Sequence, residues 1–496
     1  MVPVNARKSG EDAGGTPALR GGYSVLLEGR PSRTIEDLPE PNVLYLPLKS
    51  RRFTFSDVLV KEGERVAAGQ VLARDPDRFS LPLLAPQSGS VRLKAAENHI
   101  VLENLAASPQ RVHVADERPS HAPRESLSVG EKREKLLALG AWQFLYDAHT
   151  GELPDPSGTP RAVLVSTVAL DPFVARGDVQ LRERLTAFAR GLEHLQSLLE
   201  YQPIYLVMPD VHSALASEVR EMTRGHAWVQ RVEIPLRYGM DCLTVLARRL
   251  GLMRDPRQPV WALRTEGVFA IDNVLTFSLP CTERIVSVGG PAVESPVHVR
   301  AVPGYPLKAI LERRVTEEYV RVINGGVLSG EAVGSDKLGL DAECSGLTVV
   351  PDHVERELLA FVRPGWNRRS YSKCYMSSLR RAFAGRVEYG GKMQAGRLRY
   401  AERLTTGLRG ERRACISCNA CEEVCPARIM PHLIHKYLYQ GALDLAERAR
   451  VDLCVECGLC SFVCPSKIEL RQQFVDAKEQ IRRETEEAAS EGGETR

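Results

Sequence analysis

Eight of the twelve cysteines in this 496-residue chain lie within fifty residues near its carboxyl end, in two copies of one pattern. Each copy reads C-x2-C-x2-C-x3-C-P, as CISCNACEEVCP and CVECGLCSFVCP. Three closely spaced thiolates in this arrangement hold one face of an iron–sulfur cubane, and the fourth, before proline, binds the cluster of the other copy. The pattern predicts two 4Fe-4S clusters and one-electron transfer between them.

Crossed ligation assigns the cysteines to two sets. One cluster takes Cys415, Cys418, Cys421 and Cys464, and the other takes Cys454, Cys457, Cys460 and Cys425. Crossing brings both clusters close together, as an electron relay requires. Zinc is the competing reading, because C-x2-C pairs also form tetrahedral sites, but a zinc ribbon needs two pairs rather than four evenly spaced cysteines twice. A purely structural role for the clusters stays open.

Other metal-binding residue types are less informative. His432 and His435 lie between the two repeats, in a segment with apolar residues at helical spacing, and we interpret them as partly exposed helix histidines because sulfur already fills the eight ligand positions. The four remaining cysteines have no partner at ligand spacing and are expected to be small buried hydrophobic residues. They are Cys242, Cys281, Cys344 and Cys374.

Bulk composition excludes several classes of protein. The chain is 43% hydrophobic and 26% charged, with a formal net charge of +3, which does not support nucleic-acid binding. No stretch approaches the roughly 20 apolar residues that span a bilayer, and the amino-terminal residues lack the apolar core of an export signal. We expect a cytosolic protein with reduced thiols, able to dock on a membrane partner.

Changes in pattern along the chain predict several domains, since 496 residues exceed a single core. Short apolar strands separated by Gly-containing turns suggest an all-β module, and alternating strands and helices suggest a parallel sheet flanked by helices. The predicted boundaries are a disordered tail 1–21, a β module 22–105, a linker 106–130, an α/β domain 131–259, a second β-rich module 260–345, a basic helical segment 346–412, a helical cysteine-rich domain 413–482 and a disordered tail 483–496.

Within the α/β domain, we predict buried strands at 162–166 and 204–208 and one long amphipathic helix at 179–200. Helices are also expected at 213–223 and 242–250. The segment VWALRTEGVFAI, at 260–271, is interpreted as β structure that begins the next module.

A basic segment precedes the cysteines. Residues 363–413 contain 14 Lys and Arg residues against three Glu. Charge runs are usually solvated faces, but an excess this large beside a redox centre also suits docking of an acidic ferredoxin, an acidic partner protein or anionic lipid headgroups.

A family resemblance covers most of residues 22–475. The cysteine-rich segment resembles the dicluster domain of the C subunits of Rnf ferredoxin:NAD oxidoreductases. The upstream chain resembles the A subunits of Na+-translocating NADH:quinone reductases (Nqr). The upstream resemblance rests on KEGERVAAGQVLARD, SGTPRAVLVSTVALDPF, TERIVSVGGPAVESPVHVRAVPG, INGGVLSGEAVG and PGWNRRSYS.

This resemblance implies a multidomain α/β and β fold: a barrel-sandwich hybrid at 22–105, a Rossmann-like domain at 131–259, a soluble-ligand-binding β-grasp domain at 260–345 and a ferredoxin domain at 413–482. It also implies a peripheral protein on the cytoplasmic side of the membrane, in an ion-translocating (Na+ or H+) oxidoreductase with integral-membrane partners. Nqr A subunits are associated with quinone reduction and lack the clusters, whereas this chain has all eight cysteines.

The resemblance also raises the question of FMN and NADH. Rnf C subunits carry a Gly-rich loop for both at the start of the α/β domain, where backbone N–H groups reach phosphates. Here the stretch reads LLALGAWQFLYD, with only Gly140 and the bulky Trp142 and Phe144. We therefore expect no FMN site, and electrons that arrive from a ferredoxin or flavoprotein. Direct binding of FMN and NADH, and a scaffold role, remain the alternatives. Gly325–Gly330 is interpreted as a turn.

Overall fold

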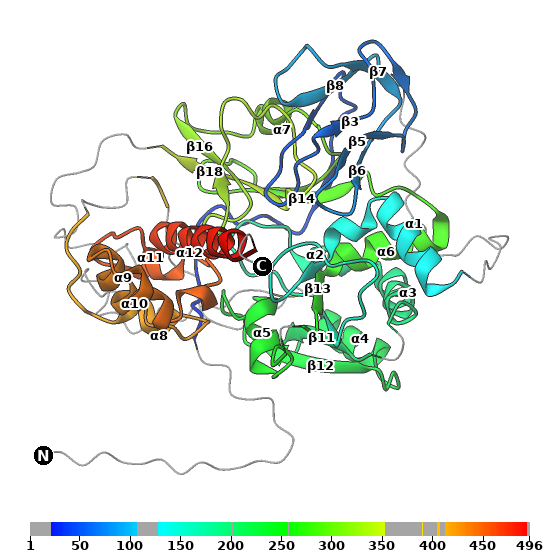
Figure 1. The fold of residues 1–496 in the computed structure, drawn as a ribbon. Helices are drawn as coiled ribbons and strands as arrows, with labels where there is room; N and C mark the ends of the chain where they lie inside the picture. The colour runs from blue at the N-terminus through cyan, green and yellow to red at the C-terminus, as the bar shows by residue number, and fades with distance from the viewer. Residues whose placement is uncertain are drawn as a thin grey trace, which may run out of the picture.

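The computed structural model describes residues 21–106, 127–199, 202–255, 257–352, 389, 404–406 and 412–493. In Figure 1, two β-rich parts lie above a sheet flanked by helices, and the helical cysteine-rich domain lies to one side of both. Cys374 and most of the basic segment 363–413 lie outside the described residues, as do tail residues 1–20 and linker residues 107–126. Within the described part, no helix is long and apolar enough to cross a membrane.

The amino-terminal β module consists of two small antiparallel sheets around one core. The first sheet has the order β2 (Leu44–Pro47), β8 (His99–Glu103), β7 (Gly89–Arg92), β4 (Arg65–Val66), and the second has the order β3 (Asp57–Val58), β5 (Val71–Asp75), β6 (Leu81–Leu84). Alternate residues point inward, so Leu44, Leu46 and Leu102 are completely buried. The predicted β module is present, but residues 35–37, within its predicted range, form a strand of the mixed sheet described below.

The α/β domain is built on a five-stranded sheet. Its order is β12 (Val229–Ile234), β11 (Ile204–Pro209), β10 (Ala162–Ser166), β13 (Val260–Arg264), β9 (Tyr146–Asp147), and only β9 is antiparallel to its neighbour. The helices are α1 (Val129–Ala138), α2 (Gly177–Leu181), α3 (Leu185–Gln196), α4 (Ala214–Met222), α5 (Leu243–Arg249) and α6 (Thr265–Phe277). Continuous apolar runs such as AVLVS form strands that are buried on both faces.

Two expectations for this domain are wrong. The helix predicted at 179–200 is two helices, because the chain turns at Glu183, whose φ of 61° is left-handed and cannot continue a helix. The segment 260–271 is not all β structure, since β13 ends at Arg264 and α6 begins at Thr265. Because β13 pairs with β10, the parallel sheet continues past residue 259.

A mixed six-stranded sheet follows. Its order is β1 (Ile35–Asp37), β15 (Val297–Ala301), β14 (Arg284–Gly289), β18 (Gly346–Pro351), β16 (Val320–Asn324), β17 (Glu331–Ala332), with α7 (Leu307–Leu311) as its helix. β1 precedes the β module in sequence but pairs in parallel with β15. β18 lies beyond the expected limit at residue 345 and pairs with both β14 and β16. Such long-range pairing leaves no local pattern in the sequence.

The cysteine-rich domain is helical, as predicted. It contains α8 (Ala420–Val424), α9 (Pro431–Tyr439), α10 (Leu443–Arg448), the short 3-10 helix η3 (Val451–Leu453), α11 (Leu459–Val463) and α12 (Leu470–Gly493). Ile434, Ala446 and Phe474 are completely buried in its core. The tail predicted at 483–496 is helical as far as Gly493, supported by side-chain contacts four residues apart, such as Arg483 with Glu479.

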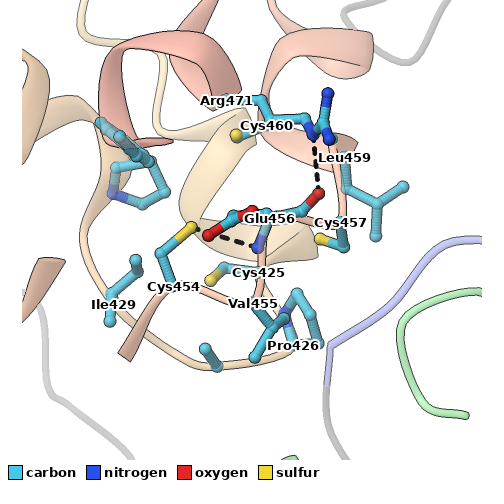
Figure 2. A pocket seen from close by; sticks show the side chains of 14 residues that line it. Cys425, Pro426, Ile429, Cys454, Val455, Glu456, Cys457, Leu459, Cys460 and Arg471 are labelled. Carbon is cyan, nitrogen blue, oxygen red and sulfur yellow. Dashed lines mark hydrogen bonds between the residues drawn. The ribbon is translucent and has the colours of Figure 1, made fainter. Parts of the chain in front are cut away.

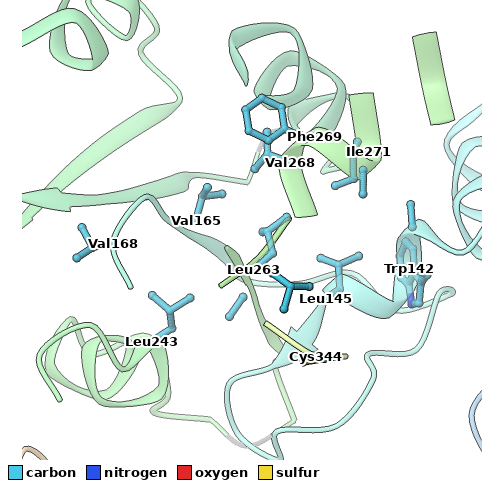
Figure 3. Packing of buried hydrophobic residues seen from close by; sticks show 14 of the residues in the cluster. Trp142, Leu145, Val165, Val168, Leu243, Leu263, Val268, Phe269, Ile271 and Cys344 are labelled. Atoms are coloured by element: carbon cyan, nitrogen blue, oxygen red, sulfur yellow. The ribbon is translucent and has the colours of Figure 1, made fainter. Parts of the chain in front are cut away.

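The start of the α/β domain is filled by an aromatic side chain. Gly140 adopts a left-handed φ of 79° before the 3-10 helix η1 (Ala141–Phe144), and this turn directs Trp142 into the core. The Trp142 indole is completely buried, donates to the carbonyl of Pro154 at 2.9 Å and packs edge-on against Trp261 at 5.3 Å. Figure 3 shows Trp142 in the same buried layer as Leu145 and Leu263.

Candidate iron–sulfur centres

Two pockets in the cysteine-rich domain are each lined by four cysteines. The first is lined by Cys425, Cys454, Cys457 and Cys460. Figure 2 shows their sulfur atoms around a common space, with Pro426 and Leu459 completing the wall. We refer to it as pocket B. Three of its cysteines come from the second repeat and one from the first.

We refer to the second pocket as pocket A. It is lined by Cys415, Cys418, Cys421 and Cys464. The two pockets therefore divide the eight cysteines into the two sets that crossed ligation predicts. Among the described residues, no three His, Cys, Asp or Glu side chains converge on the position of a single metal ion.

The loops of the two repeats have the same backbone geometry. Ser417 and Glu456 both precede the second cysteine of their repeat and have φ values of 53° and 54°. Asn419 and Gly458, which follow that cysteine, are also left-handed, at 59° and 75°. Left-handed residues reverse the chain within one or two positions. Each loop therefore bends around its pocket, and the Glu456 N–H donates to the Cys454 sulfur at 3.4 Å.

Burial makes these sulfurs costly to ionise without a positive partner. It raises the pKa of Cys421 to about 12 and that of Cys454 to about 11, and it raises the pKa of Cys457 well above the ordinary value. Thiolates are nevertheless the form that binds metal, and a coordinated metal ion deprotonates its thiol. The buried sulfurs therefore suit iron, whose positive charge would stabilise all four thiolates of a pocket.

Pocket B is covered by the body of the protein. The Tyr238 hydroxyl donates to the carbonyl of Cys457 at 2.7 Å. From α5, Arg248 donates to the carbonyl of Leu453 at 3.0 Å and Arg249 to that of Pro426 at 2.9 Å. These contacts hold both segments that contribute cysteines to pocket B.

The mixed sheet also contacts this pocket. Arg471 donates to the carbonyls of Glu456 at 2.9 Å and Ser329 at 3.0 Å. Gly458 approaches Leu328 so closely that a Cβ there would lie 2.4 Å from the Leu328 carbonyl oxygen. The turn predicted at Gly325–Gly330 is therefore present between β16 and β17, but its contact with the cysteine-rich domain has no sequence signal.

Pocket A lies at the surface of the cysteine-rich domain. Cys418 is exposed, and the neighbouring Ile416 is 67% exposed. Ser417 and Asn419 are exposed as well. The loop that carries Cys418 is therefore accessible from solvent.

The two histidines between the repeats and the cysteines outside the repeats differ in burial. His432 lines pocket A, 3.5 Å from Glu422, whereas His435 is buried in α9 with Gln473 at 2.7 Å, so the expectation of exposure is wrong for His435. Cys344 is buried, as expected, and Cys242 and Cys281 are half-buried.

Residues near pocket B that the sequence did not suggest include Asp171, Ser329 and Arg471. Asp171 lies in the loop after β10, and Ser329 donates a short hydrogen bond to its Oδ2. Asp171 and Ser329 lie in segments that carry the family resemblance, but no sequence pattern predicts that these residues meet, because three separate domains bring them together.

Comparisons with known proteins find four known domains along the chain. Four family models match: the RnfC barrel sandwich hybrid domain over residues 28–108, the NqrA second alpha/beta domain over 127–225, the NQRA C-terminal domain over 285–335 and a 4Fe-4S dicluster domain over 414–469. Together they span the three modules before the cysteines and the cysteine-rich domain itself.

Similar proteins include the A subunits of two Na(+)-translocating NADH-quinone reductases. The protein of Alcanivorax borkumensis is 27% identical over 440 residues, covering 86% of this chain and 90% of its own length. That of Actinobacillus pleuropneumoniae serotype 5b is 25% identical over 435 residues, with the same coverage. Among solved structures, the NAD+-reducing [NiFe]-hydrogenase in the air-oxidized state aligns over 45% of this chain and 47% of its own, at 12% identity and a TM-score of 0.36.

Proposed function

Since this chain belongs to the family of Nqr A and Rnf C subunits, we propose that it is the peripheral electron-transfer component of an ion-translocating oxidoreductase complex. In this proposal, pockets A and B each hold one 4Fe-4S cluster, and electrons pass between them. The complex translocates Na+ or H+ and acts as an NADH:quinone or ferredoxin:NAD oxidoreductase.

The observation that carries the proposal is the division of eight cysteines into two four-sulfur pockets. A mononuclear zinc site needs four sulfurs about 2.3 Å from one point. Among the described residues no three His, Cys, Asp or Glu side chains converge on one such point, although four cysteines line each pocket. Four separated thiolates suit a cubane, in which each cysteine binds a different iron.

The closeness of the pockets favours a relay over a purely structural role. The sulfur of Cys460, in pocket B, interacts electrostatically with that of Cys421, in pocket A. Cys421, Cys425 and Cys464 also belong to one buried cluster of side chains. Reduction potentials of such clusters respond to charge, burial and hydrogen bonds to sulfur, and these differ between the covered pocket B and the exposed pocket A.

The proposal also covers the cofactors and partners of the chain. Trp142 fills the position where a Gly-rich loop would approach FMN phosphates, which supports a chain without FMN that receives electrons from an acidic ferredoxin or a flavoprotein. The partners would be integral-membrane subunits, on the cytoplasmic side, with quinone as an acceptor of the complex. We also assign the α/β domain to the Rossmann-like folds and the mixed sheet to the β-grasp folds.

Anaerobic reconstitution tests the central proposal. The full chain should bind about eight irons and eight acid-labile sulfides, and dithionite should reduce two magnetically coupled centres reversibly. Failure to bind iron would refute the relay. Clusters that bind but cannot be reduced would favour the scaffold alternative.

Two further measurements separate the remaining alternatives. Bleaching of the isolated holo-protein by NADH alone would support direct NADH and FMN binding. Purification from solubilised membranes should recover integral-membrane subunits with the chain, whereas recovery of a lone protein would contradict the assignment to a complex.

A further inference from the structure

The carboxyl group of Asp171 is connected to the wall of pocket B through Ser329 and Arg471. Asp171 follows β10 at the carboxyl edge of the parallel sheet, and the glycine turn between β16 and β17 packs against it. Ser329 Oγ and the Leu328 N–H both donate to the carboxyl group. Its other oxygen, Oδ1, is fully covered by protein and has no hydrogen-bond partner among the described residues. Asp171 as a whole is half-buried, but its covered Oδ1 is shielded from solvent, which favours the protonated form.

Two short chains of contacts connect this carboxyl group to the sulfur-bearing loop. Ser329, which bonds Asp171 through its side chain, accepts from Arg471 through its carbonyl, and Arg471 also donates to the Glu456 carbonyl in the wall of pocket B. The second connection is electrostatic: Asp171 and the Cys457 sulfur both raise the pKa of Tyr238, whose hydroxyl donates to the Cys457 carbonyl. Charge added in pocket B therefore acts on Asp171 along both connections.

We propose that Asp171 is a redox-linked proton site, which takes up one proton when one electron enters the cluster of pocket B. This inference rests on the proposed function, because it requires a reducible cluster there. The electron comes from a low-potential one-electron donor, and the proton comes from solvent and binds the Asp171 carboxylate. One O–H bond forms on the carboxyl group and one breaks in the hydronium ion or buffer acid that supplies the proton, and the added negative charge is matched by one positive charge.

Burial and the neighbouring charged groups set the pH range in which Asp171 takes up the proton. Burial raises the pKa of Asp171 to about 7, and the neighbouring Asp241 raises it as well, whereas the Ser329 and Leu328 hydrogen bonds and the Arg264 guanidinium lower it. Tyr238, from the loop after β12, and the thiol of Cys242, at the start of α5, stay neutral in this range because burial raises the pKa of each. Arg471, from α12, is the cation on the pocket side.

The direction in which the pKa of Asp171 and the midpoint potential change follows from electrostatics. Reduction adds negative charge behind Ser329 and raises the pKa of Asp171 further. Between the pKa values of the oxidised and reduced states, the midpoint potential then falls as pH rises. The slope approaches about 59 mV per pH unit for full coupling, since 59 mV is the equivalent of a tenfold change for a one-electron couple.

Potentiometric titration of the reconstituted full chain, followed by electron paramagnetic resonance between pH 5.5 and 9, tests this inference. The midpoint potential of the pocket B cluster should fall with rising pH in the wild type. Asp171→Asn should abolish this slope. Glu183→Gln is the control, because Glu183 is an 82% exposed carboxylate of the same domain, and it should leave the slope unchanged. A redox-induced infrared difference spectrum should show a carboxylic acid C=O band that appears on reduction and is lost in Asp171→Asn.

A wild-type potential that is flat across this range, or a slope that survives in Asp171→Asn, would overturn the inference while leaving the relay intact. Absence of any cluster would instead refute the proposed function. If Asp171→Asn fails to assemble the cluster, Ser329→Ala carries the test. It removes a hydrogen bond that lowers the pKa of Asp171, so the sloping range should move to higher pH, and an unmoved range would count against the site.

Discussion

The hydroxyl of Tyr238 donates to the carbonyl oxygen of Cys457 across 2.7 Å, which joins the loop after β12 to a loop that forms pocket B. Tyr238 is only 6% exposed, and its backbone also pairs with Tyr23 near the amino terminus of the described chain. Three segments remote in sequence thus meet behind one pocket. The cysteine-rich domain is therefore held by the rest of the protein rather than attached as a free module.

Tyr238→Phe should loosen the Cys457 loop without disturbing packing, because only the hydroxyl is lost. We expect the free energy of unfolding to fall by about 0.5–1.5 kcal/mol. The pocket B cluster should also be lost faster on warming. Cluster absorbance followed during a thermal ramp measures this, with the pocket A cluster as the internal reference. Equal loss from both pockets would contradict a local role for the hydroxyl.

Arg248→Ala should weaken the attachment of the cysteine-rich domain, because it removes the guanidinium that donates to the Leu453 carbonyl. Hydrogen bonds to charged groups contribute about 1.5–3 kcal/mol each. Limited proteolysis between the domains should become faster. Arg257→Ala is the matched control, since Arg257 is 91% exposed and its side chain bonds locally, to Asp255; its proteolysis rate should equal that of wild type.

Serine substitutions distinguish crossed from uncrossed ligation. If ligation is crossed, Cys425→Ser and Cys457→Ser damage the same cluster and leave the same residual spectrum. Cys464→Ser should then match Cys418→Ser. Electron paramagnetic resonance of the four reduced variants provides the comparison, and a Cys425→Ser spectrum that matches Cys418→Ser would show that each repeat binds its own cluster.

His298 should make the protein acid-sensitive. The ring is completely buried, with Nδ1 2.7 Å from the Ser32 carbonyl and Nε2 accepting from the Arg176 N–H. Burial lowers the pKa of His298 to about 4. The unfolded state therefore binds a proton at His298 at a higher pH than the folded state does. The contribution of His298 to the free energy of unfolding is fully present above about pH 6.5 and is lost as pH falls towards 4.

The size of this effect is about 3 kcal/mol by linkage. Urea unfolding at pH 7.5 and pH 4.5 measures it in wild type and His298→Gln. The wild type should lose more stability than the variant over this interval. Parallel losses in both proteins would show that His298 is not the group responsible.

The cysteines that line each pocket could be predicted from sequence, because spacing identifies the three that share a loop and the two-repeat pattern assigns the fourth to the other loop. The helices around them were predictable for the same local reason. The relation of β1 to β15 was not, because roughly 260 residues of chain separate partners that no local pattern connects. Asp171 and Ser329 escaped prediction similarly, since their proximity exists only once two sheets and the cysteine-rich domain have packed together.

The contrast between the exposed Cys418 and the covered Cys457 also bears on chemical durability. Oxygen, peroxide and chelators reach pocket A before pocket B, so damage should begin there. A chain that has lost only the outer cluster would remain folded and attached, because the body holds the pocket B loops. In the proposed relay, such a chain would no longer exchange electrons with outside donors, so oxidative stress would stop electron transfer.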